Sequence, residues 1–177
     1  MKISRIFQRL TFYSFKTGLN LLSLFNHRMY MRYYVPLLHK YGMQFDGQPR
    51  YIAKTVQFDD FNKIRLSERV VISGDVRFLT HDYSYTTAQI AIGGEILSDI
   101  AITRPISIGR NVFIGARSFV LPGTTIEDNC IVGAGTVVRG HIPSGSVVIG
   151  NPGKVICSIE HLAEKWKALS KDMLRQD

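Results

Sequence analysis

One of the five histidines in the chain has a sequence setting that suits acid–base chemistry. His81 comes directly before Asp82, and an imidazole whose ordinary pKa is near 6.5 can accept a hydroxyl proton at neutral pH. A carboxylate or a backbone carbonyl usually fixes the tautomer of such an imidazole, and Asp82 is the adjacent candidate. Because neighbouring side chains of a strand point to opposite faces, contact of Asp82 with a substrate or a loop is the alternative.

The residues that follow His81 offer further polar groups for contact with a substrate. The sequence places the candidates in an irregular segment, residues 82–101, and they are Tyr83, Tyr85, Glu95 and Asp99. We expect this segment to hold an acceptor molecule or to contact another subunit.

A six-residue period indicates the elements that position these residues. Seven apolar residues stand six apart, namely Ile102, Ile108, Ile114, Val120, Ile126, Val132 and Val138. A period of six fits neither a helix nor a flat strand, and it is typical of a parallel β-helix, in which equivalent side chains stack from coil to coil. The same phase runs upstream through Leu66, Ile72 and Phe78.

A second pattern supports the β-helix. Small or apolar residues stand two positions before the period residues, and they are Ile106, Val112, Ser118, Thr124, Cys130 and Thr136. Residues that tolerate turns often follow the period residues, as Gly109, Gly115 and Gly133 do, and we expect these glycines to supply the backbone angles of tight corners. The paired pattern is absent from residues 82–101, which we predict to be a loop that leaves the coil.

The N-terminal region differs from the rest in charge. Residues 1–50 hold eight Lys or Arg and one acid, Asp46, which accounts for +7 of the total charge of +8. We predict helices over residues 1–45, with a break at Pro36 and an exit at Gly42. One interpretation is a cap on the open end of the β-helix. The alternative is a cap that also contacts an anionic membrane through residues 1–35. Nucleic acid is not expected, because no known binding module is present.

The end of the chain and the cysteines complete the outline. From Ser158, an expected N-cap, apolar residues repeat at helical spacing (Ile159, Leu162, Trp166, Leu169 and Met173) and predict a C-terminal helix that packs through this face. Two cysteines give no disulfide framework, which favours a reducing, cytoplasmic setting. No signal peptide is expected, and the apolar run at residues 19–25 is too short to span a bilayer. We therefore divide the chain into residues 1–49, 50–157 and 158–177.

Several segments together resemble the hexapeptide-repeat acyltransferases, and among these most closely the maltose, galactoside and polysaccharide O-acetyltransferases. The resemblance covers about residues 60–156, and the segments that carry it are IGRNVFIGA at 108–116, LPGTTI at 121–126, IVGAGTVV at 131–138, IPSGS at 142–146 and GNPGKVI at 150–156. It implies an all-β core built as a left-handed parallel β-helix, a homotrimer with active sites between subunits, and acetyl-CoA as the acetyl donor.

The resemblance also assigns residues to roles. His81 matches the essential histidine and would act as general base on a sugar hydroxyl without a covalent enzyme intermediate. The turn Gly115-Ala116 would supply an oxyanion donor. The resemblance implies further contacts to coenzyme A, and their positions are Ala116, Gly133, Ala134, Arg139, Gly140 and Lys154. The two cations suit its phosphates, with a solvated surface cation as the alternative for each.

The chain departs from the family at two places. Phe113 stands where many relatives carry Trp, which keeps an apolar wall beside the substrate but loses an N–H donor. The basic N-terminal region is unlike that of maltose acetyltransferases, so no acceptor residues can be transferred there.

We therefore expect an acetyl-CoA-dependent O-acetyltransferase that acts on a carbohydrate, in the biosynthesis of a surface polysaccharide. N-acetylation of an amino sugar nucleotide, acetylation of serine or a drug, and a scaffold without activity are the alternatives. No metal is expected, because a zinc hydratase of this fold needs three converging histidines and only His81 lies among the regular repeats.

Overall fold

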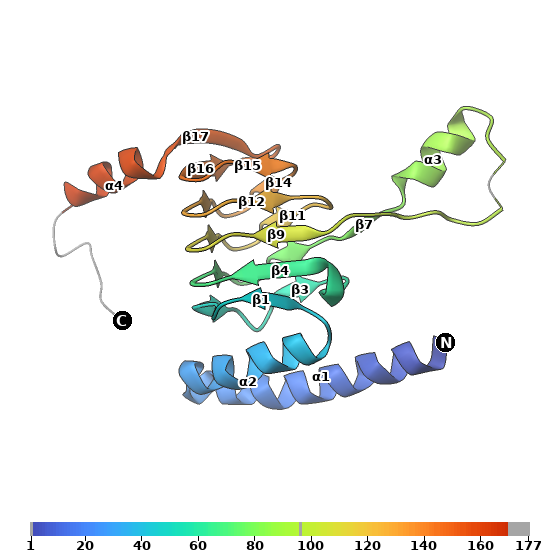
Figure 1. The fold of residues 1–177 in the computed structure, drawn as a ribbon, viewed down its shortest axis with the longest axis horizontal. Helices are drawn as coiled ribbons and strands as arrows, with labels where there is room; N and C mark the ends of the chain where they lie inside the picture. Colours follow the sequence, from blue (N-terminus) through green and yellow to red (C-terminus); the bar gives the residue numbers. More distant parts are fainter. Residues whose placement is uncertain (1, 96, 170–177) are drawn as a thin grey trace.

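The computed structural model describes residues 2–95 and 97–169, and it shows a parallel β-helix with helices at both ends (Figure 1). The elements in chain order are α1 (Lys2–Phe25), α2 (His27–Lys40), β1 (Gln44–Asp46), β2 (Tyr51–Ile52), β3 (Gln57–Phe58), the 3-10 helix η1 (Phe61–Lys63), β4 (Ile64–Ser67), β5 (Val71–Ile72), β6 (Arg77–Phe78), β7 (His81–Asp82), α3 (Ser84–Ala91), β8 (Ile102–Thr103), β9 (Ile106–Ile108), β10 (Phe113–Ile114), β11 (Phe119–Val120), β12 (Thr125–Ile126), β13 (Ile131–Val132), β14 (Val137–Val138), β15 (His141–Ile142), β16 (Ser146–Ile149), β17 (Lys154–Ser158) and α4 (Ile159–Lys167).

Three sheets form the walls of the β-helix. Sheet A has the order β1-β4-β9-β12-β15, sheet B the order β17-β16-β13-β10-β5-β2, and sheet C the order β14-β11-β6-β3. Each coil visits the sheets in the order A, B, C, so the chain turns at an A–B corner, a B–C corner and a C–A corner. The first coil already begins at β1, ahead of residue 50, because Gln44 pairs with Arg65 of β4.

The number of residues in a coil varies at two ends of the stack. Ile114 pairs with Val132, and Val120 with Val138, which gives 18 residues for a regular coil of three hexads. Ile52 pairs with Ile72, a separation of 20, because η1 lengthens the first C–A corner. Val132 pairs with Val148, a separation of 16, so the last coil is two residues short. These differences explain why the first and last strands depart from the six-residue phase.

The predicted ladder forms the core, with one exception. Residues 108, 114, 120, 126, 132 and 138 are buried, and so are the six residues that stand two positions before them. Ile102 was expected in the ladder but is 37 % exposed, because β8 pairs antiparallel with β7 outside the coil. The regular hexads therefore resume at Ile106 rather than at Ile102.

The glycines at the corners serve a purpose other than the predicted one. Gly109, Gly115 and Gly133 have ordinary φ angles, and the left-handed residues are found two positions later, for example Asn111 and Gly135. A side chain at Gly115 would collide with the backbone of Ala134 in the next coil. The close approach of stacked coils, rather than the geometry of the turn, thus requires glycine there.

The segment predicted as a loop is an arm with its own secondary structure. Its base is the antiparallel pair β7–β8, and its outer part holds α3. Thr86 joins the two sides, since its hydroxyl oxygen accepts a hydrogen bond from the backbone N–H of Ile100 at 2.8 Å. The arm projects away from the coil on the side opposite α4 (Figure 1).

Two helices cap the first coil, and they meet at a residue other than the expected one. The break lies at Asn26, whose side chain accepts from the backbone N–H of Met29 and caps α2, whereas Pro36 lies inside α2. Phe12 packs against Tyr41 and Phe61, with ring centroids 5.1 and 4.9 Å apart, so α1 is joined to the end of the coil. No helix of the described residues is long and apolar enough to cross a membrane.

The last strand and helix close the other end. β17 runs antiparallel to β16, and the Ser158 side chain accepts from the backbone N–H of His161 to cap α4, as predicted. Met173 and the rest of residues 170–177, expected to continue this helix, lie outside the described residues. Trp166 is 48 % exposed, so the predicted packing face of α4 is only partly covered within one chain.

Candidate active site

His81 lies at the C–A corner, where the arm leaves the second coil, and two carboxylates of the first coil face it. Its Nδ1 atom is 3.3 Å from Oδ2 of Asp59 and 3.9 Å from Oδ2 of Asp60. Both carboxylates follow β3, which pairs directly below β6, so the register of sheet C brings them to the histidine. A carboxylate beside Nδ1 favours the tautomer that leaves Nε2 free to accept a proton.

Thr80 holds the two carboxylates in place. Its backbone N–H donates to Oδ2 of Asp59 at 3.1 Å, and its hydroxyl donates to Oδ2 of Asp60 at 2.9 Å. Thr80 is fully buried, so it is a fixed donor that holds the two partly exposed carboxylates next to the histidine. The ring of Tyr83 meets that of His81 edge to face at 5.6 Å and limits its rotation from the other side.

Asp82 faces the arm rather than the imidazole. Its Oδ1 accepts from the backbone N–H of Ser84 at 2.8 Å, and this bond holds the pKa of its carboxyl below the usual range. The positive charge of Arg139 acts in the same direction, so that side chain lies toward the base of the arm. The structure therefore supports the alternative role of Asp82, contact with the loop, and gives the place beside His81 to Asp59.

A groove of about 1510 Å³ runs from α1 along the first coil to His81. Its lining includes Phe12, Lys16, Tyr34, Lys54, Asp59 and His81. The groove joins the N-terminal helices to the imidazole and has room for a ligand larger than one sugar ring. One lining atom, Oδ1 of Asn20, is buried without a hydrogen-bond partner among the described residues.

The residues expected to contact coenzyme A are divided between two corners. At the B–C corner Ala116 lies one coil below Ala134, which is exposed, and Gly133 precedes Ala134 in the same coil. Gly153 donates its N–H to Val137 O at 2.9 Å, which seats the turn before Lys154 above the same corner. Arg139 and Gly140 lie instead at the C–A corner, after β14.

The B–C corner offers one of the two expected oxyanion donors. The N–H of Gly115 donates to Val132 O at 2.8 Å and is used within the coil. In the described part of the chain, the N–H of Ala116 forms no hydrogen bond and remains available. The small side chains leave the backbone open to a narrow ligand, and a Cβ added at Gly135 would meet nothing within 4 Å.

The other candidate residues are spread over the arm and sheet B. Tyr85 lies in α3, and Glu95 and Asp99 are exposed between α3 and β8. Phe113 is 42 % exposed on the outer face of sheet B, away from the corner that holds His81. A single chain thus does not bring Phe113 and the B–C corner to His81.

Sequence reasoning did not identify Asp59 and Asp60. They precede the regular hexads, and the 20-residue first coil shifts them out of phase with the ladder. The signal that could have revealed them is the pair Ile52 and Phe58, six apart as in the ladder, which places the next residues at a corner.

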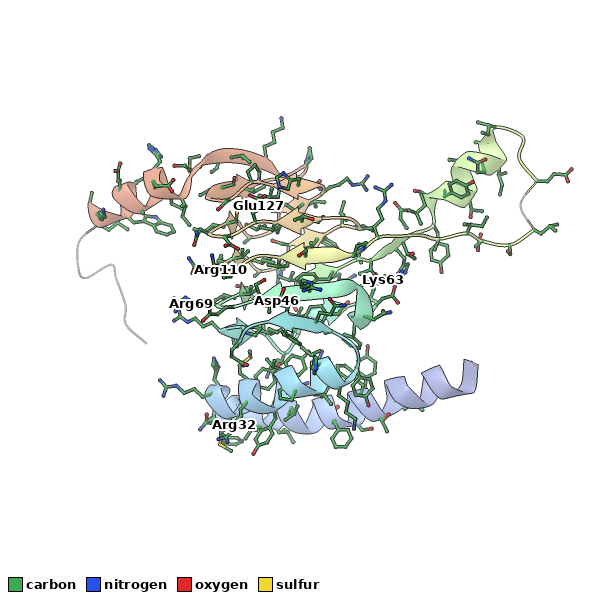
Figure 2. All side chains as sticks on the ribbon, in the orientation of Figure 1. Arg32, Asp46, Lys63, Arg69, Arg110 and Glu127 are labelled. Atoms are coloured by element: carbon green, nitrogen blue, oxygen red, sulfur yellow. The ribbon has the colours of Figure 1, made fainter. Side chains whose placement is uncertain are left out.

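The A–B corner carries its own ion pairs, which have a structural character. Arg69 and Arg110 lie one above the other along it (Figure 2). Asp128 accepts from the backbone N–H of Arg110 at 2.7 Å and from its guanidinium at 2.8 Å, and these bonds lower the pKa of the Asp128 carboxyl. Among the described residues, no group of three or more His, Cys, Asp or Glu could hold a metal ion.

Comparison with known sequences identifies several acetyltransferases. Residues 105–139 match the family model described as the hexapeptide repeat of succinyl-transferase. A putative lipopolysaccharide biosynthesis O-acetyl transferase of Escherichia coli K12, WbbJ, is 31 % identical over 138 residues, which cover 71 % of this chain and 70 % of that protein. The putative acetyltransferase YvoF of Bacillus subtilis is 33 % identical over 105 residues, 59 % of this chain, and the chain spans about half (54 %) of its length.

Comparison with solved structures confirms the expected left-handed parallel β-helix. A maltose O-acetyltransferase from Clostridium difficile 630 superposes with a TM-score of 0.56 at 23 % identity, covering 82 % of this chain and 84 % of that one. A galactoside acetyltransferase in complex with coenzyme A gives a TM-score of 0.58 at 22 % identity, covering 96 % of this chain and 88 % of the other.

Proposed function

Because the chain belongs to the hexapeptide-repeat acetyltransferases, we propose that it transfers an acetyl group from acetyl-CoA to a carbohydrate hydroxyl. The observation that carries this proposal is His81, with Asp59 at 3.3 Å from Nδ1, at the end of a groove that can hold an acceptor. A role in surface polysaccharide biosynthesis is supported by the similarity to the Escherichia coli O-acetyl transferase.

The residues at the C–A and B–C corners suit the proposed chemistry. Nε2 of His81 takes the proton of the acceptor hydroxyl while its oxygen attacks the thioester carbonyl carbon. The unpaired N–H of Ala116, from a neighbouring copy, would donate to the carbonyl oxygen as negative charge develops there. As the carbon–sulfur bond breaks, the imidazolium returns the proton to the thiolate, which leaves coenzyme A as a thiol and an acetyl ester on the sugar. Asp59 stabilises the transient imidazolium.

We propose further that the active site is completed by a second copy in a homotrimer. Support comes from the outer face of sheet B, whose stacked, partly exposed residues are apolar, namely Tyr51, Val71, Phe113 and Ile131. The stacked residues on the outer face of sheet A are polar, namely Gln44, Arg65, Ser107, Thr125 and His141. An apolar outer face on one wall favours contact with another copy, which would bring a B–C corner to His81.

The arm supports the same assembly. Leu97 and Ile92 are 104 % and 77 % exposed on the arm. Covering apolar side chains of this size with another protein surface would lower the free energy. We infer that the arm lies on a neighbouring copy.

The test is an acetyl-transfer assay with the full chain. We expect release of coenzyme A from acetyl-CoA in the presence of an acceptor from a panel of sugars and amino sugars. The product should gain one acetyl group that hydroxylamine removes, as expected for an ester and not for an amide. His81→Ala should lower kcat/KM by roughly a thousandfold, within the usual range for a general base.

The matched control is His161→Ala, which removes an exposed histidine on α4 and should leave the rate unchanged. Transfer that proceeds equally well in the His81→Ala variant would refute the assignment of the base. A hydroxylamine-resistant product would show that the acceptor is an amine.

A further inference from the structure

Over residues 10–25, helix α1 turns apolar side chains away from the protein and the one cation of this stretch toward it. Among residues 10–25 the exposed side chains include Leu10, Leu21 and Phe25, the last 88 % exposed. These three lie on one side of the helix, opposite Phe12, because an α-helix advances about 100° per residue. Lys16 is the one charged residue of this stretch, and its Nζ donates to Val56 O at 3.3 Å, under the helix.

This distribution is the reverse of that in a helix whose outer face contacts water. Burial lowers the pKa of the Lys16 ammonium, so the inward placement of this cation has a free-energy cost. The outer face offers no compensating charge between Leu10 and Phe25. An apolar environment outside α1 would explain both features.

The second helix adds cations beside this apolar surface. Arg28, Arg32 and Lys40 are exposed on α2, together with Met29 and Tyr33. Arg32 lies on the outer side of the helix layer (Figure 2), and in Figure 1 no other described segment lies beyond α1 and α2. The first acidic residue of the chain is Asp46, so nothing within residues 1–45 neutralises these cations.

We propose that the outer face of the α1–α2 layer binds the surface of an anionic lipid bilayer. Leu10, Leu21, Leu24 and Phe25 would enter the boundary between headgroups and acyl chains, while Arg28, Arg32 and Lys40 contact lipid phosphates. A bilayer fits the charge better than a second copy of the same face does, because two such faces would bring cations against cations. The helices lie on the membrane, since none in the described residues can cross one.

The experiment is co-sedimentation of the full chain with vesicles. We expect binding to vesicles of phosphatidylglycerol and phosphatidylcholine in equal parts, weaker binding to phosphatidylcholine alone, and loss of the difference at 1 M salt, where the Debye length is about 3 Å. Arg28→Gln with Arg32→Gln should weaken binding to the anionic vesicles by about fivefold per cation removed. Leu21→Ser with Leu24→Ser and Phe25→Ser should weaken it by at least about tenfold.

Matched variants elsewhere make the result specific. Lys165→Gln and Lys167→Gln each remove an exposed cation from α4, and neither should change vesicle binding. Circular dichroism should show every variant folded, since each changed side chain is exposed.

Two results would overturn the proposal. One is the absence of binding to anionic vesicles at low salt. The other is a change of oligomeric state in the Leu21, Leu24 and Phe25 variant, measured by analytical ultracentrifugation, which would assign the face to a second copy. Neither result depends on enzymatic activity, so the outcome is separate from that of the acetyl-transfer assay.

Discussion

The C–A corner and the B–C corner are built from the same stacked hexads, yet they present opposite kinds of surface. The C–A corner gathers ionisable side chains, with His81 beside Asp59 and Asp60, and sends out the arm. The B–C corner presents Ala116, Gly133 and Ala134, and what it offers is backbone.

The difference shows that one repeating scaffold can hold two unlike half-sites. Proton transfer needs side chains that titrate, whereas a narrow thioester arm needs close access to N–H groups, which larger side chains would block. In the proposed homotrimer, one chain would carry half of two separate sites, because the two corners belong to different edges of the coil. The complete site would then combine the C–A corner of one copy with the B–C corner of another.

Mixing two inactive variants tests this division most strongly. His81→Ala disables the C–A corner, and Ala134→Trp fills the B–C corner with an exposed ring that should exclude acetyl-CoA. Each alone should be inactive. Co-refolded or co-expressed in equal amounts, they should regain roughly a quarter of the wild-type rate, because random association pairs two intact corners in about one site in four.

The control for this prediction is a double variant that carries both changes in one chain, mixed with wild type. If the corners of a single chain formed the site, the two separate variants would give no activity on mixing, and the division between copies would be wrong.

Asp59→Asn tests whether the C–A corner acts through charge. The amide keeps a side-chain oxygen for Thr80 but loses the negative charge beside Nδ1 of His81. We expect kcat to fall about tenfold to a hundredfold, with KM for both substrates nearly unchanged, because the loss appears as the imidazolium forms. Steady-state kinetics measure this split.

Asp60→Asn is the matched control. Its carboxylate is 3.9 Å from the same nitrogen and is bonded to the Thr80 hydroxyl, so its effect on kcat should be smaller. An Asp60 variant slower than the Asp59 variant would reverse the assignment of the positioning residue.

We expect the smallest effect from a substitution at the A–B corner. It should change stability and not catalysis, and it therefore serves as a reference for substitutions at the other two corners. Asp128 has a pKa below its unfolded value, so its bonds to Arg110 stabilise the fold above about pH 4 and are lost as the pH falls. Asp128→Asn should lower the melting temperature by a few degrees at pH 7, and the difference from wild type should shrink as the pH falls below about 4. Thermal melts across this pH range measure it.

This variant should leave kcat unchanged, in contrast to changes at the other corners. Glu164→Gln, on the exposed face of α4, should alter neither stability nor rate and serves as the reference. A loss of activity in the folded Asp128 variant would show that all three corners contribute to catalysis.

The core of the coil could be predicted from the sequence because its determinant is local. An inward side chain must stack on its equivalent 18 residues away, and every residue from Ile108 to Val138 in the ladder obeys this rule. The position of His81 followed in the same way, from the interruption of the period.

The partners of His81 could not be predicted, because they depend on a register that the period does not report. The pairing of β3 with β6 brings Asp59 beneath the histidine, at a separation of 20 residues between Phe58 and Phe78, and nothing in the hexads signals the two extra residues. Ile102 keeps the phase by coincidence, while its strand pairs with β7 in the arm. At the N-terminus, the cap by Asn26 determines where α1 and α2 part, and Pro36 is accommodated within α2.

The position of His81 along the coil axis bears on the stage of glycan assembly at which acetylation would occur. The histidine leaves the second coil, and coils are spaced by about 4.8 Å, while α1 adds about 10 Å below the first. With α1 on a bilayer, the imidazole would stand roughly 15 Å above the lipid, held there by the stacked coils. Only a sugar held at about that height could then reach His81. The enzyme would acetylate a short glycan that is still attached to its lipid, and it would not acetylate the same sugar when a longer chain carries it farther from the bilayer.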